Sequence, residues 1–300
     1  MTPVSGEMTV GSPDGRRLEA VDEGDPSGTL LVCHHGSPGA AVPFEPFDRA
    51  AAERGIRLVT FSRPGFGDSS RDEGRSVASA AADAAALADH FAAERFLTMG
   101  WSGGGPHALA CAALLPDRVR AAATIAGVAP YDAQGLDWTA GMGESNQIEY
   151  PLAARDPDEL LRWMRPHAEA LGAAGPNEIV SELRSVISEV DEAEVTGALG
   201  ELMATSFHRA FSAGPWGWFD DDLAFVRPWG FELASIGVPV SVWQGRQDLM
   251  VPFAHGEWLV EHIPTARSRL RPEHGHLSLA VGSFGEILDD LLEAAALGGP

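Results

Sequence analysis

The sequence contains no lysine, and all 21 of its basic residues are arginines. Schiff-base chemistry, pyridoxal phosphate anchoring and a phosphate-binding P-loop each require a lysine, so these mechanisms are excluded. The sequence holds only two cysteines, which cannot form a structural zinc site unaided. Both lie in apolar segments, so we expect Cys33 and Cys111 to be buried free thiols.

Long apolar runs are also missing. No stretch approaches 18 consecutive apolar residues, so we expect no membrane span. Residues 1–7 lack the basic start and apolar core of a signal peptide, and we expect a cytoplasmic protein. The formal net charge of −22 disfavours nucleic acids and anionic membranes as partners. We expect a small-molecule substrate instead, and the sequence does not decide between a monomer and a homo-oligomer.

What is present is enough apolar material for a full core, with 45% hydrophobic residues in 300. Short apolar runs alternate with helical patterns up to about residue 126, and this alternation resumes near residue 238. It predicts parallel strand–helix–strand units in an α/β fold, with the sheet covered on both faces. Helical patterns dominate between these parts, among them one predicted over residues 177–190. We therefore predict a core of residues 1–130 and 234–300, interrupted by a helical cap over residues 131–233.

The most specific motif is Gly-x-Ser-x-Gly at residues 100–104. An apolar run of strand character precedes it, and an Ala/Leu-rich helical run over residues 106–115 follows it. A strand-to-helix turn of this kind is a nucleophile elbow, in which small residues allow the tight turn and the serine hydroxyl is raised off the backbone. The motif predicts Ser102 as a nucleophile.

A serine hydroxyl needs a nearby base, and the base needs a carboxylate to orient it. Asp248 follows the predicted strand over residues 238–243, and His276 follows the next predicted strand, over residues 267–271. We select Asp248 as the acid and His276 as the base, since the order Ser, Asp, His is typical of elbow-type enzymes. His274 is a competing base, and Glu273 is a second candidate for the acid.

An acyl-transfer transition state carries an oxyanion, which requires preorganised donors. The backbone N–H of Gly103 supplies one in this prediction. The loop after the strand over residues 29–33 supplies the other through Ser37. His34 and His35 lie in the same loop, where we favour packing or loop anchoring over metal binding, because no carboxylate cluster accompanies them. We expect no metal and no cofactor.

These pieces resemble the α/β-hydrolase superfamily. The resemblance rests on the segments at residues 35–39, 63–69, 100–104, 245–252 and 275–276. It implies an eight-stranded, mostly parallel sheet with a helical cap inserted between strands six and seven. It also implies Ser102, Asp248 and His276 as the triad, with Ser37 and Gly103 as oxyanion donors. Epoxide hydrolases and haloalkane dehalogenases of this fold have aspartate at the nucleophile position, so serine argues against both. Proline iminopeptidases typically have tryptophan after the serine, where this chain has Gly103.

The aromatic residues of the predicted cap are the only direct indication of the substrate. We predict a pocket lined by tryptophans at Trp101, Trp138, Trp216 and Trp218, and residues 215–219 are expected to form a loop between helices. Such a lining favours an apolar or aromatic acyl group. The expected activity is hydrolysis of a carboxylic ester, in preference to an amide. Alternatives are a proline-iminopeptidase-like aminopeptidase, carbon–carbon bond hydrolysis, lyase chemistry or perhydrolysis on the same triad, and a non-catalytic small-molecule binder.

Overall fold

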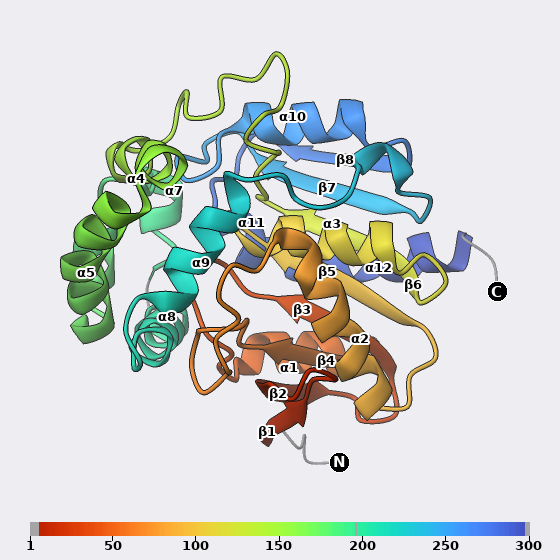
Figure 1. Ribbon diagram of the computed structural model, residues 1–300. Helices are drawn as coiled ribbons and strands as arrows, with labels where there is room; N and C mark the ends of the chain where they lie inside the picture. The colour runs from red at the N-terminus through yellow and green to blue at the C-terminus, as the bar shows by residue number, and fades with distance from the viewer. Residues whose placement is uncertain (1–5, 196, 298–300) are drawn as a thin grey trace.

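The computed structural model describes residues 6–195 and 197–297. The first five and last three residues of the predicted core therefore lie outside the described residues. Eight strands form one sheet in the order β1-β2-β4-β3-β5-β6-β7-β8 (Figure 1). β1 and β2 form an antiparallel hairpin, β2 pairs antiparallel with β4, and all later pairs are parallel. The strands are β1 Gly6–Gly11, β2 Arg17–Gly24, β3 Thr29–His34, β4 Ile56–Phe61, β5 Phe96–Trp101, β6 Val119–Ile125, β7 Val240–Gly245 and β8 Ala266–Arg271.

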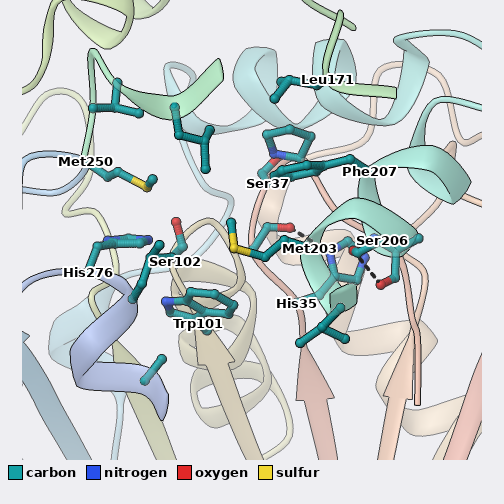
Figure 2. Close-up of a pocket in the computed structure, with 18 of the residues that line it drawn as sticks. His35, Ser37, Trp101, Ser102, Leu171, Met203, Ser206, Phe207, Met250 and His276 are labelled. Carbon is teal, nitrogen blue, oxygen red and sulfur yellow. Dashed lines mark hydrogen bonds between the residues drawn. The ribbon is translucent and has the colours of Figure 1, made fainter. Parts of the chain in front are cut away.

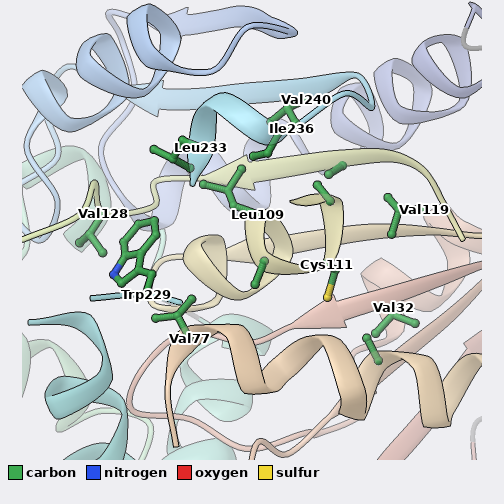
Figure 3. Close-up of a cluster of buried hydrophobic side chains, with 14 of the residues drawn as sticks. Val32, Val77, Leu109, Cys111, Val119, Val128, Trp229, Leu233, Ile236 and Val240 are labelled. Atoms are coloured by element: carbon green, nitrogen blue, oxygen red, sulfur yellow. The ribbon is translucent and has the colours of Figure 1, made fainter. Parts of the chain in front are cut away.

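Helices cover both faces of this sheet, which confirms the predicted α/β architecture. One face packs against α2, α3 and α10, and Figure 3 shows part of this buried cluster, including Leu109, Val119 and Val240. The other face packs against α1 and α12 through a second cluster. The helices of the two layers are α1 Glu45–Ala52, α2 Ala80–His90, α3 Gly104–Leu114, α10 Phe253–His262 and α12 Phe284–Leu297. None of the described helices is long and apolar enough to cross a membrane.

Residues 131–233, between β6 and β7, are called the helical segment, and six α-helices lie in its described part. They are α4 Glu144–Arg155, α5 Pro157–Ala173, α6 Ile179–Leu183, α7 Glu189–Glu192, α8 Gly197–Ala210 and α9 Trp216–Phe225. Figure 1 shows α4, α5, α8 and α9 gathered to one side of the sheet. The division of the chain into a core and a cap stays a prediction.

The structure corrects two expectations about this segment. The pattern over residues 177–190 is not one helix, because α6 ends at Leu183 and α7 begins at Glu189. Residues 216–219 are not a loop but the first turn of α9. Three consecutive aspartates follow in α9, and two of them pair with arginines from another part of the chain: Asp220 with Arg71 and Asp221 with Arg63. Such long-range pairing is absent from local sequence patterns, so propensity alone does not reveal this helix.

Candidate active site

Ser102 occupies the turn between β5 and α3. Its φ of 56° lies in the left-handed region, a strained conformation for a residue with a side chain. The glycines two residues before and two residues after Ser102 are required for steric reasons. A Cβ on Gly100 would lie 2.0 Å from the carbonyl oxygen of Gly104, and a Cβ on Gly104 would lie 2.0 Å from that of His34. The tight turn therefore requires glycine two residues before and two residues after Ser102.

Asp248 and His276 come together at the same edge of the sheet. Asp248 lies in the loop after β7, and His276 immediately precedes α11, which spans Leu277–Gly282. The Nδ1 of His276 is 2.8 Å from the Oδ2 of Asp248, and both side chains are almost fully buried. The Oδ1 of Asp248 also accepts the backbone N–H groups of Met250 and Val251. The carboxylate therefore fixes its own loop as well as the imidazole.

Burial disfavours the charge on both groups. For His276 the charge of Asp248 and the hydrogen bond to it outweigh burial, so the pKa of the imidazole is raised above 6.5. For Asp248 burial dominates and raises the pKa of the carboxyl, although His276 and the backbone donors oppose this. Because Nδ1 faces Asp248, the Nε2 atom of His276 is left to exchange protons with a neighbour.

The Ser102 side chain lies next to this imidazole (Figure 2). Figure 2 shows the imidazole of His276 beside the Ser102 side chain, with the sulfur of Met250 above them. The indole of Trp101 lies against the imidazole, with ring centroids 5.8 Å apart. The structure thus brings all three predicted triad residues to one place.

The competing residues lie elsewhere. The side chains of His274 and Glu273 are 25% and 66% exposed, and they face each other at 4.0 Å. A Cβ on Gly282 would meet the His274 ring at 3.4 Å, so this imidazole rests on α11. Neither side chain forms a hydrogen bond or ion pair with Asp248 or His276 in the described part of the chain.

Gly103 and Ser37, which carry the two predicted oxyanion donors, lie close together. A Cβ on Gly103 would lie 3.2 Å from the backbone nitrogen of Ser37 and 2.7 Å from its Cβ. The same Cβ would lie 2.9 Å from the ring of Phe225, in α9. A larger residue after the serine therefore has no room, which accounts for the difference from the iminopeptidase pattern.

The loop that carries Ser37 is held by buried polar groups. The backbone N–H of Arg63 donates to the Nε2 of His35 at 3.1 Å, so this histidine anchors the loop. The guanidinium of Arg63 donates to the carbonyl oxygens of His35 and Gly36. It also pairs with Asp221 of α9, at 2.6 Å. Burial alone would raise the pKa of Asp221, but Arg63 and Arg75 hold it well below its ordinary value.

Asp221 could not be singled out from the sequence. Its only signal is the run of three aspartates beside an aromatic cluster, which is unusual for an exposed acidic stretch. Among the described residues, no group of three or more histidine, cysteine, aspartate or glutamate side chains is arranged to hold a metal ion.

A cavity of about 230 Å³ opens above Ser102, between the core and the helical segment. Its wall combines Ser102, His276 and Ser37 with mostly apolar side chains from the helical segment (Figure 2). Two of the four predicted tryptophans, Trp101 and Trp218, line it. Other lining residues are Trp163, Leu171, Leu183, Met203, Phe207 and Met250.

The predicted pocket positions of Trp138 and Trp216 need correction, because neither is among the described residues that line the cavity. Trp138 is 5% exposed, donates from Nε1 to the carbonyl of Ala129 and packs in the hydrophobic core. Trp216 lies under the guanidinium of Arg71, 4.4 Å from its ring centroid. Composition identifies the tryptophans but does not tell which of them point into the cavity.

One buried acidic pair borders this cavity. Glu149 of α4 lines it, and its Oε1 accepts from the Nε1 of Trp218 at 2.6 Å. Its carboxyl group also contacts that of Asp222, and burial raises the pKa of both. Two carboxyl groups in contact share a proton more readily than they both ionise. Glu149 is thus one of three glutamates, with Glu23 and Glu182, that line the otherwise mostly apolar cavity and can meet a polar or cationic part of a ligand.

The sequence matches one family model and is similar to two other proteins. A family model described as alpha/beta hydrolase fold matches residues 29–283. The uncharacterized hydrolase YcgS of Bacillus subtilis (strain 168) is 27% identical over 287 residues, 94% of this chain and 96% of that protein. The pimeloyl-[acyl-carrier protein] methyl ester esterase of Nitrosomonas europaea is 27% identical over 185 residues, 61% of this chain and 64% of that protein.

Solved structures share the fold. A thermophilic esterase from Thermogutta terrifontis superposes with a TM-score of 0.69 and 20% identity, covering 97% of this chain and 99% of that one. A bromoperoxidase from Bacillus anthracis superposes with a TM-score of 0.67 and 21% identity, covering 96% and 100%. At such identities the likeness speaks for the fold alone. Because the family model spans most of the sequence and the eight-stranded sheet agrees with it, the chain belongs to the α/β-hydrolase fold family.

Proposed function

We propose that the protein is a serine hydrolase that cleaves a carboxylic ester of a small to medium apolar substrate. One observation carries this proposal: the buried 2.8 Å contact between His276 and Asp248, beside a serine held at positive φ in a strand-to-helix turn. A histidine oriented by a carboxylate next to a raised serine hydroxyl is the arrangement that nucleophilic acyl transfer requires.

The proposed reaction has two halves. The Oγ of Ser102 forms a bond to the ester carbonyl carbon while its proton passes to the Nε2 of His276. The negative oxygen accepts the backbone N–H groups of Gly103 and Ser37. When the ester C–O bond breaks, the alcohol takes the proton from Nε2 and leaves an acyl-enzyme. Water then attacks the acyl carbon with His276 as base, and the carboxylic acid is released as the Ser102 hydroxyl regains its proton.

The apolar wall of the cavity supports an apolar acyl group. Met203, Phe207 and Leu171 face the space above Ser102 (Figure 2), and burying alkyl or aromatic surface against them favours binding. The volume of about 230 Å³ suits a small to medium group. Relatives named as esterases agree with this substrate class.

A second candidate, an aminopeptidase acting on small peptides or amides, draws on a different observation. The carboxyl group of Glu149 lines the cavity, and a buried carboxylate can pair with a substrate ammonium group. This candidate predicts faster turnover of aminoacyl anilides than of fatty-acyl esters. It also predicts that Glu149→Gln raises KM for aminoacyl substrates far more than for simple esters.

The test combines labelling and kinetics. A fluorophosphonate probe should label the native protein stoichiometrically and fail to label Ser102→Ala. Turnover of p-nitrophenyl esters should fall by a factor of about 10⁴ or more in Ser102→Ala, with the fold intact by circular dichroism. Retention of most activity in this variant would remove Ser102 from the mechanism. Stoichiometric labelling of a protein inactive on esters and anilides alike would instead favour carbon–carbon cleavage, lyase chemistry or perhydrolysis.

A further inference from the structure

The loop that carries His276 is held from the helical segment by one carboxylate. Asp191 belongs to α7 and is fully buried. Its Oδ2 accepts the backbone N–H of His276 at 2.9 Å. Its Oδ1 accepts the backbone N–H groups of Leu277 and Ser278, each at 2.9 Å, and the hydroxyl of Ser278 at 3.0 Å. Four donors of one short stretch therefore converge on a single side chain from another part of the fold.

The backbone just before His276 also passes very close to the carboxylate of Asp191. A Cβ on Gly275 would lie 2.3 Å from the Oδ2 of Asp191, so the chain before His276 can pass the carboxylate only as glycine. The side chain of Leu277 packs into the hydrophobic cluster of the helical segment, with Leu171 and Leu183. The backbone on both sides of His276 is thus fixed against the helical segment.

The geometry points to Asp191 as a positioning residue for the base: it fixes the backbone of His276 so that the imidazole, oriented by Asp248, faces Ser102. This inference rests on the proposed function, since it concerns the same triad. Asp191 touches no reacting atom in this scheme and acts only through His276.

The charge of Asp191 adds a second effect. Burial alone would raise its pKa, but the hydrogen bonds from Ser278 and His276 hold it below its ordinary value, so the carboxylate is ionised at neutral pH. Asp248 and Asp191 are the two charged groups that raise the pKa of His276, against the effect of burial. Loss of the Asp191 charge should therefore lower the pKa of the imidazole as well as loosen its position.

The decisive variant is Asp191→Asn, which keeps the size of the side chain but offers one acceptor oxygen where the carboxylate offers two. We expect kcat for a p-nitrophenyl ester to fall about tenfold, and up to about 100-fold in Asp191→Ala, with KM nearly unchanged, because misplacement of a reacting group slows the chemical step. The acid limb of the kcat/KM profile should move to lower pH. Ser278→Ala, which removes one of the four donors, should give a smaller fall in kcat.

Asp83→Asn is the matched control. Asp83 is a buried aspartate of α2 whose carboxylate pairs with Arg16, on an element that does not line the cavity. This variant should lose stability yet keep kcat and the pH profile of the native protein. If Asp191→Asn behaves in the same way, with lower stability but unchanged kcat and acid limb, Asp191 is merely structural and the inference is overturned.

The result is also distinguishable from a failure of the proposed function. If Ser102→Ala and His276→Ala abolish activity while Asp191→Asn does not lower kcat, only this inference fails. If Ser102→Ala remains active, the triad itself is wrong, whatever Asp191 does. Should Asp191→Ala not fold, the Asn and Ser278→Ala variants still decide the question.

Discussion

The hydroxyl of Ser37 donates a 2.8 Å hydrogen bond to the Oδ2 of Asp221, although 184 residues separate the two in the sequence. This contact joins the loop after β3 to helix α9 of the helical segment. Asp221 is also the shared partner of Arg63 and Arg75. One buried carboxylate therefore compensates two buried guanidinium groups and orients a proposed oxyanion donor.

Asp221→Asn should be strongly destabilising, because it leaves two buried arginines without their counter-charge. We expect a loss of roughly 3–5 kcal/mol in the free energy of unfolding, measured by urea denaturation. Ser37→Ala should lose only about 1–3 kcal/mol. It keeps the backbone N–H and should retain most of the turnover. An Asp221→Asn protein as stable as the native one would show that the cluster contributes little.

Activity should decline in acid as His276 becomes protonated. The base must be neutral, and Asp248 raises the pKa of the imidazole above 6.5, so kcat/KM should fall as the pH drops through a value above 6.5. His274→Gln should leave this profile unchanged, while His276→Gln should abolish turnover. A profile that stays flat down to pH 5, or the reverse ranking of the two histidine variants, would contradict the assignment.

The helical segment should set the preferred length of the acyl group. Phe207→Leu enlarges the cavity, so the ratio of kcat/KM for longer against shorter p-nitrophenyl esters should rise about tenfold, as one or two extra methylenes find space. Trp216→Leu is the control, since this residue lies outside the cavity under Arg71. Equal shifts in both variants would mean that the cavity does not bind the acyl group.

The acidic pair should make stability depend on pH. Burial raises the pKa of Glu149 and Asp222 in the folded state, so the unfolded chain binds fewer protons once the pH exceeds about 4. The contribution of this pair to stability should therefore fall as the pH rises from about 4 through the raised values. Asp222→Asn removes part of this dependence and should be more stable than the native protein at pH 8, by about 1 kcal/mol or more. Urea denaturation of both proteins at pH 5 and pH 8 checks this, because the difference between them isolates the pair from Glu23 and from the buried histidines, whose pKa values are also shifted. A stability difference between the two proteins that is the same at both pH values would contradict the shared proton.

The sequence predicted most of the core because its signals are local. The apolar runs identify the strands, and the spacing of Gly100, Ser102 and Gly104 reports a turn whose sterics admit almost nothing else. The meeting of Ser102, Asp248 and His276 could be predicted because parallel strands end at one edge of the sheet, and their order along the chain because it is typical of elbow-type enzymes.

The helical segment was harder to predict because the burial and the orientation of its side chains depend on residues that are distant in the sequence. Asp191 and Asp221 are buried only because donors from the core surround them, and an acidic sequence by itself resembles a solvated surface. Trp138 and Trp218 are residues of the same type in the same segment, yet Trp138 packs in the hydrophobic core and Trp218 lines the cavity. Only the course of the folded chain determines which side chains are buried and which line the cavity.

The chain borders the N-terminal end of α3 at two places, just before the helical segment and near its end. A Cβ on Gly105 would lie 2.9 Å from the Cα of Gly127, where the chain leaves the core, and Gly103 abuts Phe225, at the end of α9. Such an inserted module can in principle be exchanged for another without disturbing strand register, so new substrate ranges could evolve around an unchanged reaction centre. A transplanted module would, however, have to bring its own acceptors in place of Asp191 and Asp221. A chimera lacking them should fold its sheet and still turn over slowly.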